Sequence, residues 1–192
     1  YERDGDAALE SLRGMFAFAI WDAHDKRLLL ARDRYGIKPL YYAHRSDGTL
    51  VFGSEIKSLL PALGGSPGLN LEALPDFLAN RAPSGDHTLF TGIKRLLPGH
   101  ALSWQDGKIT IRRYWDLVYA EEVTGPPAGS APERDLVHEY KDRFTEAVRL
   151  RLMADVPLGS FLSGGIDSAA ITAMMTKLVG EPVNTYTVAF AE

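Results

Sequence analysis

The sequence Ser-Gly-Gly-Ile-Asp-Ser at residues 163–168 constrains the fold more than any other stretch of the chain. It follows the apolar pair Phe161-Leu162, which we expect to end a buried strand, and it precedes the alanine-rich residues 169–175, which we expect to form a helix. Backbone amides at the start of a helix lack intrahelical partners and carry the positive end of the helix dipole, and glycine lets an anion approach them. The stretch therefore predicts a phosphate-binding loop between a strand and a helix of an α/β domain.

This loop differs from two common phosphate-binding motifs. It lacks the lysine of a Walker loop and the longer glycine spacing of a dinucleotide-binding turn. The hydroxyls of Ser163 and Ser168 flank Gly164 and Gly165, and Asp167 supplies a carboxylate that could hold Mg²⁺ against phosphate oxygens. The arrangement favours pyrophosphate as the ligand. The structural alternative is that Asp167 and Ser168 only cap the helix N-terminus.

Composition excludes several classes of protein. The 192 residues are 45% hydrophobic, enough for one sizeable core or two small ones, and the net charge of -4 disfavours nucleic acid or an anionic membrane as a partner. No apolar run is long enough to span a bilayer and no secretory signal opens the sequence, so we expect a cytoplasmic protein. Cysteine is absent, which excludes disulfides and a thiolate nucleophile within these residues.

The first half is expected to consist mainly of antiparallel strands. Residues 15–21 are apolar on both faces, which predicts a strand sandwiched between two layers. Asp47-Gly48 lies between two short apolar runs and predicts a hairpin turn. The expected strands of this half are residues 15–21, 28–31, 40–43, 50–52, 101–104 and 109–115.

A change of composition divides the chain. Between residues 121 and 132 it is rich in Gly, Pro, Ala and Ser without an apolar period, which is typical of an interdomain linker. We predict one domain over residues 1–117, a linker over 118–134 and a second domain over 135–192. The chain starts without methionine and stops after a strand-like segment at 185–190, so we expect an internal piece of a longer protein.

Charged and titratable side chains outside the loop are given structural roles. Arg32, Asp33, Arg34 and Lys38 form a dense charged turn. We favour a turn held by an arginine–carboxylate pair over a phosphate site or a docking surface. The five histidines are scattered without metal-ligand spacing, and none is assigned a role.

Four further strings resemble one enzyme family. They are Leu-Arg-Gly-Met-Phe-Ala-Phe at 12–18, Ala-Arg-Asp-Arg-Tyr-Gly-Ile-Lys-Pro-Leu-Tyr-Tyr at 31–42, Phe-Gly-Ser-Glu-Ile-Lys at 52–57 and Asp-Val-Pro-Leu-Gly at 155–159. Together with the 163–168 loop, in this order and at these separations, they resemble the glutamine-hydrolysing asparagine synthetases, which join a class II glutamine amidotransferase domain to an ATP pyrophosphatase domain. The resemblance covers nearly the whole chain.

The resemblance implies a mixed α+β and α/β architecture. The first part would be the C-terminal portion of an N-terminal-nucleophile glutaminase, an αββα sandwich, and the second would be the start of a parallel α/β ATP pyrophosphatase domain. The implied reaction hydrolyses glutamine at one site and passes ammonia to β-aspartyl-AMP at another. ATP, Mg²⁺, glutamine and aspartate are the implied cofactors and substrates, and a homodimer is left open.

Carried over by position, the resemblance assigns ATP and pyrophosphate to the loop and its neighbours. These residues are Leu162, Ser163, Gly164, Gly165, Asp167, Ser168 and Val188, with Asp167 as the metal ligand. Leu162 and Val188 could instead be ordinary core residues. No catalytic residue is assigned, because the family's nucleophilic cysteine is absent, and we expect the fragment itself to be inactive. Two alternatives remain, an amidotransferase with another carboxylate acceptor and a non-catalytic truncated scaffold.

Overall fold

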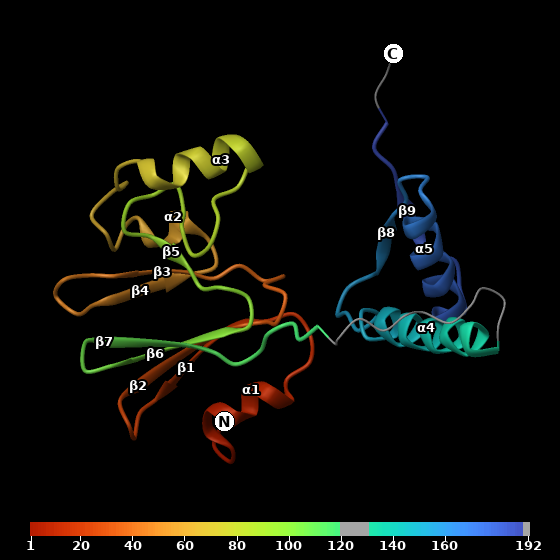
Figure 1. Ribbon diagram of the computed structural model, residues 1–192, viewed down its shortest axis with the longest axis horizontal. Helices are drawn as coiled ribbons and strands as arrows, with labels where there is room; N and C mark the ends of the chain where they lie inside the picture. Colours follow the sequence, from red (N-terminus) through yellow and green to blue (C-terminus); the bar gives the residue numbers. More distant parts are fainter. Residues whose placement is uncertain (120–130, 190–192) are drawn as a thin grey trace. The chain divides into compact units, whose positions relative to one another are not determined.

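The computed structural model describes residues 1–119 and 131–189, and the chain divides into two compact units, Tyr1–Tyr119 and Ala120–Glu192 (Figure 1). The predicted linker at 118–134 falls mainly on residues 120–130, which lie outside the described residues. Its last four residues, 131–134, belong to a helix. Within the described part of the chain, no helix is long and apolar enough to cross a membrane.

The first unit stacks two antiparallel sheets between helices (Figure 1). One sheet has the strand order β1-β2-β6-β7, and the other has the order β4-β3-β5. This is the αββα sandwich that the resemblance implies. Its elements are η1 (Gly5–Ala7), α1 (Ala8–Ser11), β1 (Ala17–Asp22), β2 (Arg27–Arg32), β3 (Tyr41–His44), β4 (Leu50–Gly53), α2 (Ile56–Leu59), η2 (Leu71–Ala73), α3 (Leu74–Asn80), β5 (Lys94–Arg95), β6 (His100–Gln105) and β7 (Lys108–Arg113).

β2 is more deeply buried than β1. Leu29 of β2 packs with Leu9 of α1, whereas Leu30 points to the opposite face and packs with residues between the two sheets. Successive side chains of a strand alternate between its faces, so an unbroken apolar run covers both. The expectation that residues 15–21 form a sandwiched strand is confirmed, because Ala17 packs against the residues between the sheets whereas Phe18 and Ile20 pack on the opposite face, beside Leu9. β1 is an edge strand, however, and only part-buried. The buried residues between the sheets are Leu30, Leu40, Tyr42, Leu96 and Leu102.

Two hairpin turns, one from each sheet, meet at one end of the sandwich. A Cβ added to Gly48 would lie 3.1 Å from the Cα of Gly107, a tight contact, whereas one added to Gly107 would lie 3.5 Å from the Cα of Gly48, an ordinary contact distance. Trp104 donates from Nε1 to the carbonyl of Gly48 at 2.8 Å, and the ring Nε2 of His44 lies 2.8 Å from the carbonyl of Gly107. The predicted Asp47-Gly48 hairpin is thus confirmed, and it also fastens one sheet to the other.

The charged turn at the other end is organised by Asp33. Its carboxylate is 1% exposed and accepts hydrogen bonds from four backbone amides. Burial alone would raise the pKa of Asp33, but the amide hydrogen bonds outweigh it and the pKa is lowered. The amides are those of Phe16, Tyr35, Ile37 and Lys38, at 3.0–3.3 Å.

Arg32 binds carbonyls and not the neighbouring carboxylate. Its guanidinium donates to the backbone oxygens of Gly36, Lys38 and Leu96 at 2.6–2.8 Å. Among the described residues no ion pair joins Asp33 to a basic side chain, so the predicted arginine–carboxylate pair is wrong. The turn itself is correct, but its backbone folds back so that amides reach the carboxylate and carbonyls reach the guanidinium.

The second unit is a strand–helix–strand arrangement with an additional helix. Its elements are α4 (Ala131–Arg149), β8 (Gly159–Phe161), α5 (Ile166–Val179) and β9 (Asn184–Tyr186). β8 and β9 are paired in parallel, and α4 packs on α5. Phe161 is 79% exposed, so β8 is not the buried strand that was expected here. The strand expected at 185–190 ends at Tyr186, and residue 190 lies outside the described residues.

The layer between the sheets should dominate the stability of the first unit. Leu30 is fully buried there, and we expect Leu30→Ala to lower the free energy of unfolding by about 2–5 kcal/mol through lost contacts and a cavity. Urea denaturation followed by tryptophan fluorescence measures this, because all three tryptophans, Trp21, Trp104 and Trp115, lie in this unit.

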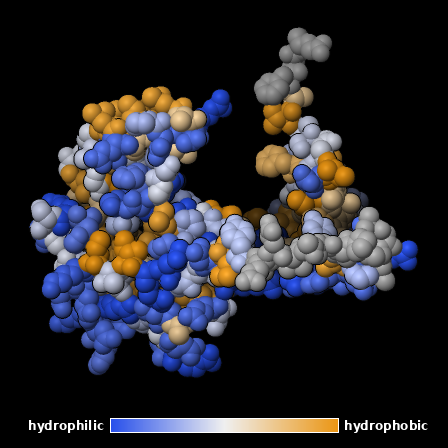
Figure 2. All heavy atoms as spheres, in the orientation of Figure 1, coloured by the Kyte–Doolittle hydropathy of each residue, from blue (hydrophilic) through white to orange (hydrophobic). Residues whose placement is uncertain are grey.

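A surface leucine provides the control for this core substitution. Figure 2 shows apolar residues gathered over α3, where Leu78 is 73% exposed. Leu78→Ala should change the unfolding free energy by no more than about 0.5 kcal/mol. Equal effects of the two substitutions would contradict the assignment of the core.

Asp33 should make the first unit pH-sensitive. We expect Asp33→Asn to lower the unfolding free energy at pH 7 by about 1–3 kcal/mol, because an amide group cannot accept all four hydrogen bonds. A carboxyl whose pKa is lowered by folding stabilises the fold above its unfolded pKa, near 4, and loses this effect as the pH falls further. Urea midpoints of the two proteins should therefore converge in acid. Asp106→Asn, at an exposed turn, is the control and should behave like the unmodified chain throughout.

Candidate functional site

Residues 162–165 connect β8 to α5, and the predicted loop, residues 163–168, extends into the first turn of that helix. Gly164 has a φ of +83°, in the left-handed region that favours glycine. Gly165 is the residue before the helix and has an ordinary extended backbone, with φ -82° and ψ 160°. The two glycines thus differ, since the backbone conformation requires only the first. At the second, an added Cβ would meet only Ser163 Oγ, at 3.7 Å.

Two hydroxyls close the loop. The Oγ of Ser168 accepts a hydrogen bond from the amide of Ser163 at 3.3 Å, lies 3.1 Å from the Oγ of Ser163 and donates to the carbonyl of Gly165 at 3.1 Å. The N-cap residue of α5 is Gly165, which has no side chain to cap the helix. Ser168 draws the two ends of the loop together, and a purely structural role of Asp167 and Ser168 at the helix start remains the alternative to anion binding.

The helix start presents unpaired amides. The first helical hydrogen bond runs from the amide of Ala169 to the carbonyl of Gly165 at 3.1 Å. Among residues 1–119 and 131–189, no acceptor is bound to the amides of Ile166, Asp167 or Ser168. Such amides, together with the helix dipole, stabilise an anion. The geometry is therefore suited to phosphate oxygens at the start of α5.

Leu162 and Val188 flank the loop at the ends of the two paired strands. The amide of Leu162 donates to the carbonyl of Tyr186 at 2.9 Å, and its carbonyl accepts from Thr187 Oγ1 at 2.6 Å. Val188 is 75% exposed, which contradicts the alternative that it is a core residue. Thr187 was missed in the sequence because a single threonine just after a short strand carries no recognisable signal.

The carboxylate at the loop fits the usual way of binding magnesium. Asp167 is exposed in the first turn of α5. Within the described residues, no cluster of three or more His, Cys, Asp or Glu could hold a metal by itself. Mg²⁺ in nucleotide sites is commonly held by one or two carboxylates together with substrate phosphates. A single carboxylate beside a phosphate site is consistent with that pattern.

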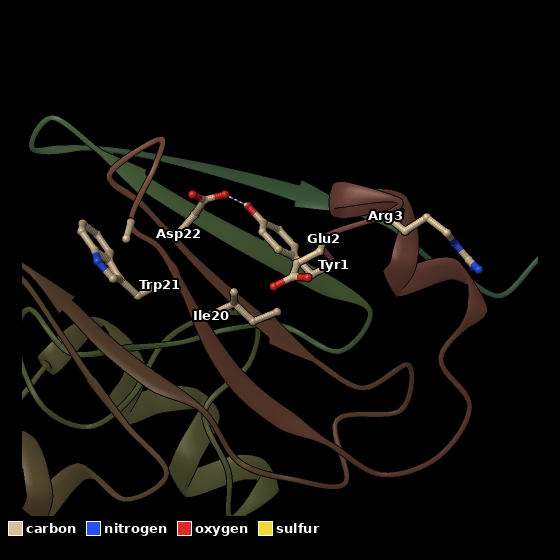
Figure 3. A pocket seen from close by; sticks show the side chains of 7 residues that line it. Tyr1, Glu2, Arg3, Ile20, Trp21 and Asp22 are labelled. Carbon is tan, nitrogen blue, oxygen red and sulfur yellow. Dashed lines mark hydrogen bonds between the residues drawn. The ribbon is translucent and has the colours of Figure 1, made fainter.

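The first unit has a pocket of its own. It measures about 620 Å³ and is lined by residues 1–3 and 20–23 (Figure 3). The hydroxyl of Tyr1 donates to Asp22 Oδ2 at 3.1 Å. The pKa of Asp22 is lowered, mainly because its carboxylate accepts from the amide of Asp25. These contacts fix the turn after β1 and bring no nucleophile or paired acid and base together, so the cavity provides no catalytic arrangement.

Comparison with known proteins agrees with the two-unit organisation. The family model described as glutamine amidotransferase domain matches residues 1–115. The chain belongs to this family. The model described as asparagine synthase matches residues 139–192, and the two matches in this order place the chain in the asparagine synthetase family that its motifs resemble.

Curated relatives of this amidotransferase chain carry two kinds of name. It is 41% identical over 180 residues to the amidase chyE of Penicillium rubens, covering 93% of this chain and 26% of the relative. It is 35% identical over 191 residues to glutamine-hydrolysing asparagine synthetase 3 of Bacillus subtilis, covering 96% and 30%. Asparagine synthetase 1 of the same organism is 36% identical over 193 residues, covering 100% and 29%. The chain thus spans less than a third of the length of these relatives.

The two glycines of the 163–168 loop should respond differently to alanine. Gly164→Ala forces a side chain into a left-handed conformation and should lower the stability of the second unit by about 1–2 kcal/mol. Gly165→Ala should cost less than about 1 kcal/mol, because its backbone suits any residue. Amide hydrogen exchange in α5 measures both effects, and a larger loss at Gly165 would contradict the loop geometry.

Proposed function

We propose that the chain is part of an ATP-dependent, glutamine-hydrolysing asparagine synthetase. The reaction converts aspartate, glutamine and ATP to asparagine, glutamate, AMP and pyrophosphate through β-aspartyl-AMP. The observation that carries the proposal is the 163–168 loop, whose unpaired amides at the start of α5 lie within the match to asparagine synthase. The proposed enzyme acts in the cytoplasm on small molecules, without nucleic acid or membrane as a partner, and a homodimer is left open.

In this proposal the loop holds the leaving part of ATP. The amides of Ile166, Asp167 and Ser168 would donate to pyrophosphate oxygens, and the missing Cβ of Gly165 would let these oxygens approach the backbone. The hydroxyls of Ser163 and Ser168, which bond to each other without ligand, would turn towards the anion. Because these groups stabilise charge that grows as pyrophosphate leaves, they would favour activation of the acceptor carboxylate.

The proposal also assigns residues to the metal ion and to the rest of the nucleotide. Asp167 would hold Mg²⁺, which neutralises phosphate charge when it is bound. Leu162 and Val188 would contact the nucleotide from the strand ends. Glutamine hydrolysis is assigned to no residue of the printed sequence, because that sequence contains no cysteine.

A second acceptor class is favoured by one specific comparison. The relative named amidase chyE is 41% identical to this chain, whereas the two relatives named asparagine synthetase reported above are 35% and 36% identical. An amidotransferase that activates a carboxylate other than aspartate would use the same pyrophosphate loop. The two functions therefore share the described site and differ in the acceptor.

Pyrophosphate release tests the proposed function. The complete enzyme that contains this chain should release pyrophosphate from ATP and Mg²⁺ when aspartate and ammonia are supplied. Gly165→Ala should lower this rate at least about tenfold, because a methyl group then stands where phosphate would approach, while the fold is retained. A coupled pyrophosphate assay with several carboxylate acceptors, followed by analysis of the amide products, identifies the acceptor.

The result separates three outcomes. Release with aspartate supports the synthetase, and release only with another carboxylate supports the second acceptor class. A folded enzyme that neither binds Mg-ATP nor releases pyrophosphate with any acceptor would leave the non-catalytic scaffold as the correct interpretation. Gly68→Ala in the first unit is the control substitution, because Gly68 has no left-handed backbone and an added Cβ would meet only Thr91 Oγ1, at 4.0 Å, so the rate should stay unchanged.

A further inference from the structure

The hydroxyl of Thr187 replaces a backbone hydrogen bond beside the loop. Parallel pairing of β8 with β9 continues one residue beyond β8, where the amide of Leu162 donates to the carbonyl of Tyr186 at 2.9 Å. In a parallel ladder that continued, the carbonyl of Leu162 would accept from the amide of Val188. It accepts from Thr187 Oγ1 instead, at 2.6 Å. The ladder therefore ends at this point.

Ending the ladder here leaves the amide of Val188 available. Among residues 1–119 and 131–189, no acceptor is bound to this amide. The carbonyl of Leu162 also keeps capacity for a second hydrogen bond, since a carbonyl oxygen has two lone pairs. An available donor and an available acceptor thus lie on neighbouring strand ends, next to the loop. Such a pair matches the edge of a base, which itself offers a donor beside an acceptor.

We propose that Thr187 is a positioning residue for the nucleotide. By occupying the carbonyl of Leu162, its hydroxyl stops the strands from pairing further and keeps the amide of Val188 free for the base of ATP. The inference rests on the proposed function, which assigns Leu162 and Val188 to the nucleotide. It concerns the base alone, because the phosphate side of the loop is fixed by the separate bonds of Ser168 to Ser163 and Gly165.

Removal of the hydroxyl should separate base binding from phosphate binding. In Thr187→Val the side chain keeps its shape but cannot donate, so the amide of Val188 can bond to Leu162 and is lost to the ligand. We expect the dissociation constant of Mg-ATP to rise about three- to tenfold, the effect of one hydrogen bond, and that of Mg-pyrophosphate to change less than about twofold. Isothermal titration calorimetry of the full chain measures both.

Two further variants show whether loss of the Thr187 hydroxyl causes the weaker binding of Mg-ATP. Thr187→Ser keeps the donor and should restore Mg-ATP binding to within about twofold of the unmodified chain. Thr185→Val makes the same exchange two residues earlier, in β9, where no hydrogen bond of the side chain to the described residues is present. It should leave both ligands unaffected, so a loss equal to that of Thr187→Val would overturn the inference.

Amide hydrogen exchange tests the same inference without a ligand. In the unmodified full chain, the amide of Val188 should exchange rapidly and that of Leu162 slowly, and in Thr187→Val the exchange of Val188 should slow by about tenfold or more. Protection of Val188 in the unmodified chain would overturn the inference whatever ATP does. If the unmodified chain does not bind Mg-ATP, both the proposed nucleotide site and the role of Thr187 are wrong. If it binds Mg-ATP and Thr187→Val binds it equally well, only the role of Thr187 is wrong.

Discussion

The buried carboxylate of Asp33 is the constraint on which the sandwich depends. A charged group removed from water costs several kcal/mol unless hydrogen bonds replace its hydration, and four amides do so here. One comes from Phe16, just before β1, and the others come from the turn that follows β2. The carbonyl of Asp33 in turn accepts from the amide of Gly99, just before β6. The ends of three neighbouring strands are therefore fixed at one residue.

Much of the fold could be predicted because its signals are local. The Asp47-Gly48 turn lies between two short apolar runs, and the structure places β3 and β4 on either side of it. The position of each strand in its sheet was harder to predict from the sequence. An apolar run shows that a strand is covered on both faces, but the central place of β2 arises from pairing with β6, for example Leu30 with Leu102. A pairing between strands that are far apart in the sequence cannot be recognised from the local pattern of apolar and polar residues.

The candidate site shows the same division between local and distant information. The loop after β8 could be predicted, because a strand, two glycines and a helix follow one another directly in the chain. The partners of the side chains could not. Arg32 binds three carbonyls and leaves Asp33 to the amides, although charge alone favoured a pair between them. Thr187 bonds to a residue 25 positions earlier, and only the parallel pairing of β8 and β9 brings the two together.

The bonds of Asp33 also have a consequence for the order in which the sandwich assembles. The four amides that donate to its carboxylate all lie within 17 positions along the chain. Closing a short segment of chain costs less entropy than closing a long one, and contacts of this kind form fast. The hydrogen bonds to this carboxylate thus involve residues 16–38 alone and do not require β6. Later strands then add to an end that is already ordered, and Gly99 donates a second hydrogen bond to the carbonyl of Asp33, which already accepts from Gly36 within the turn.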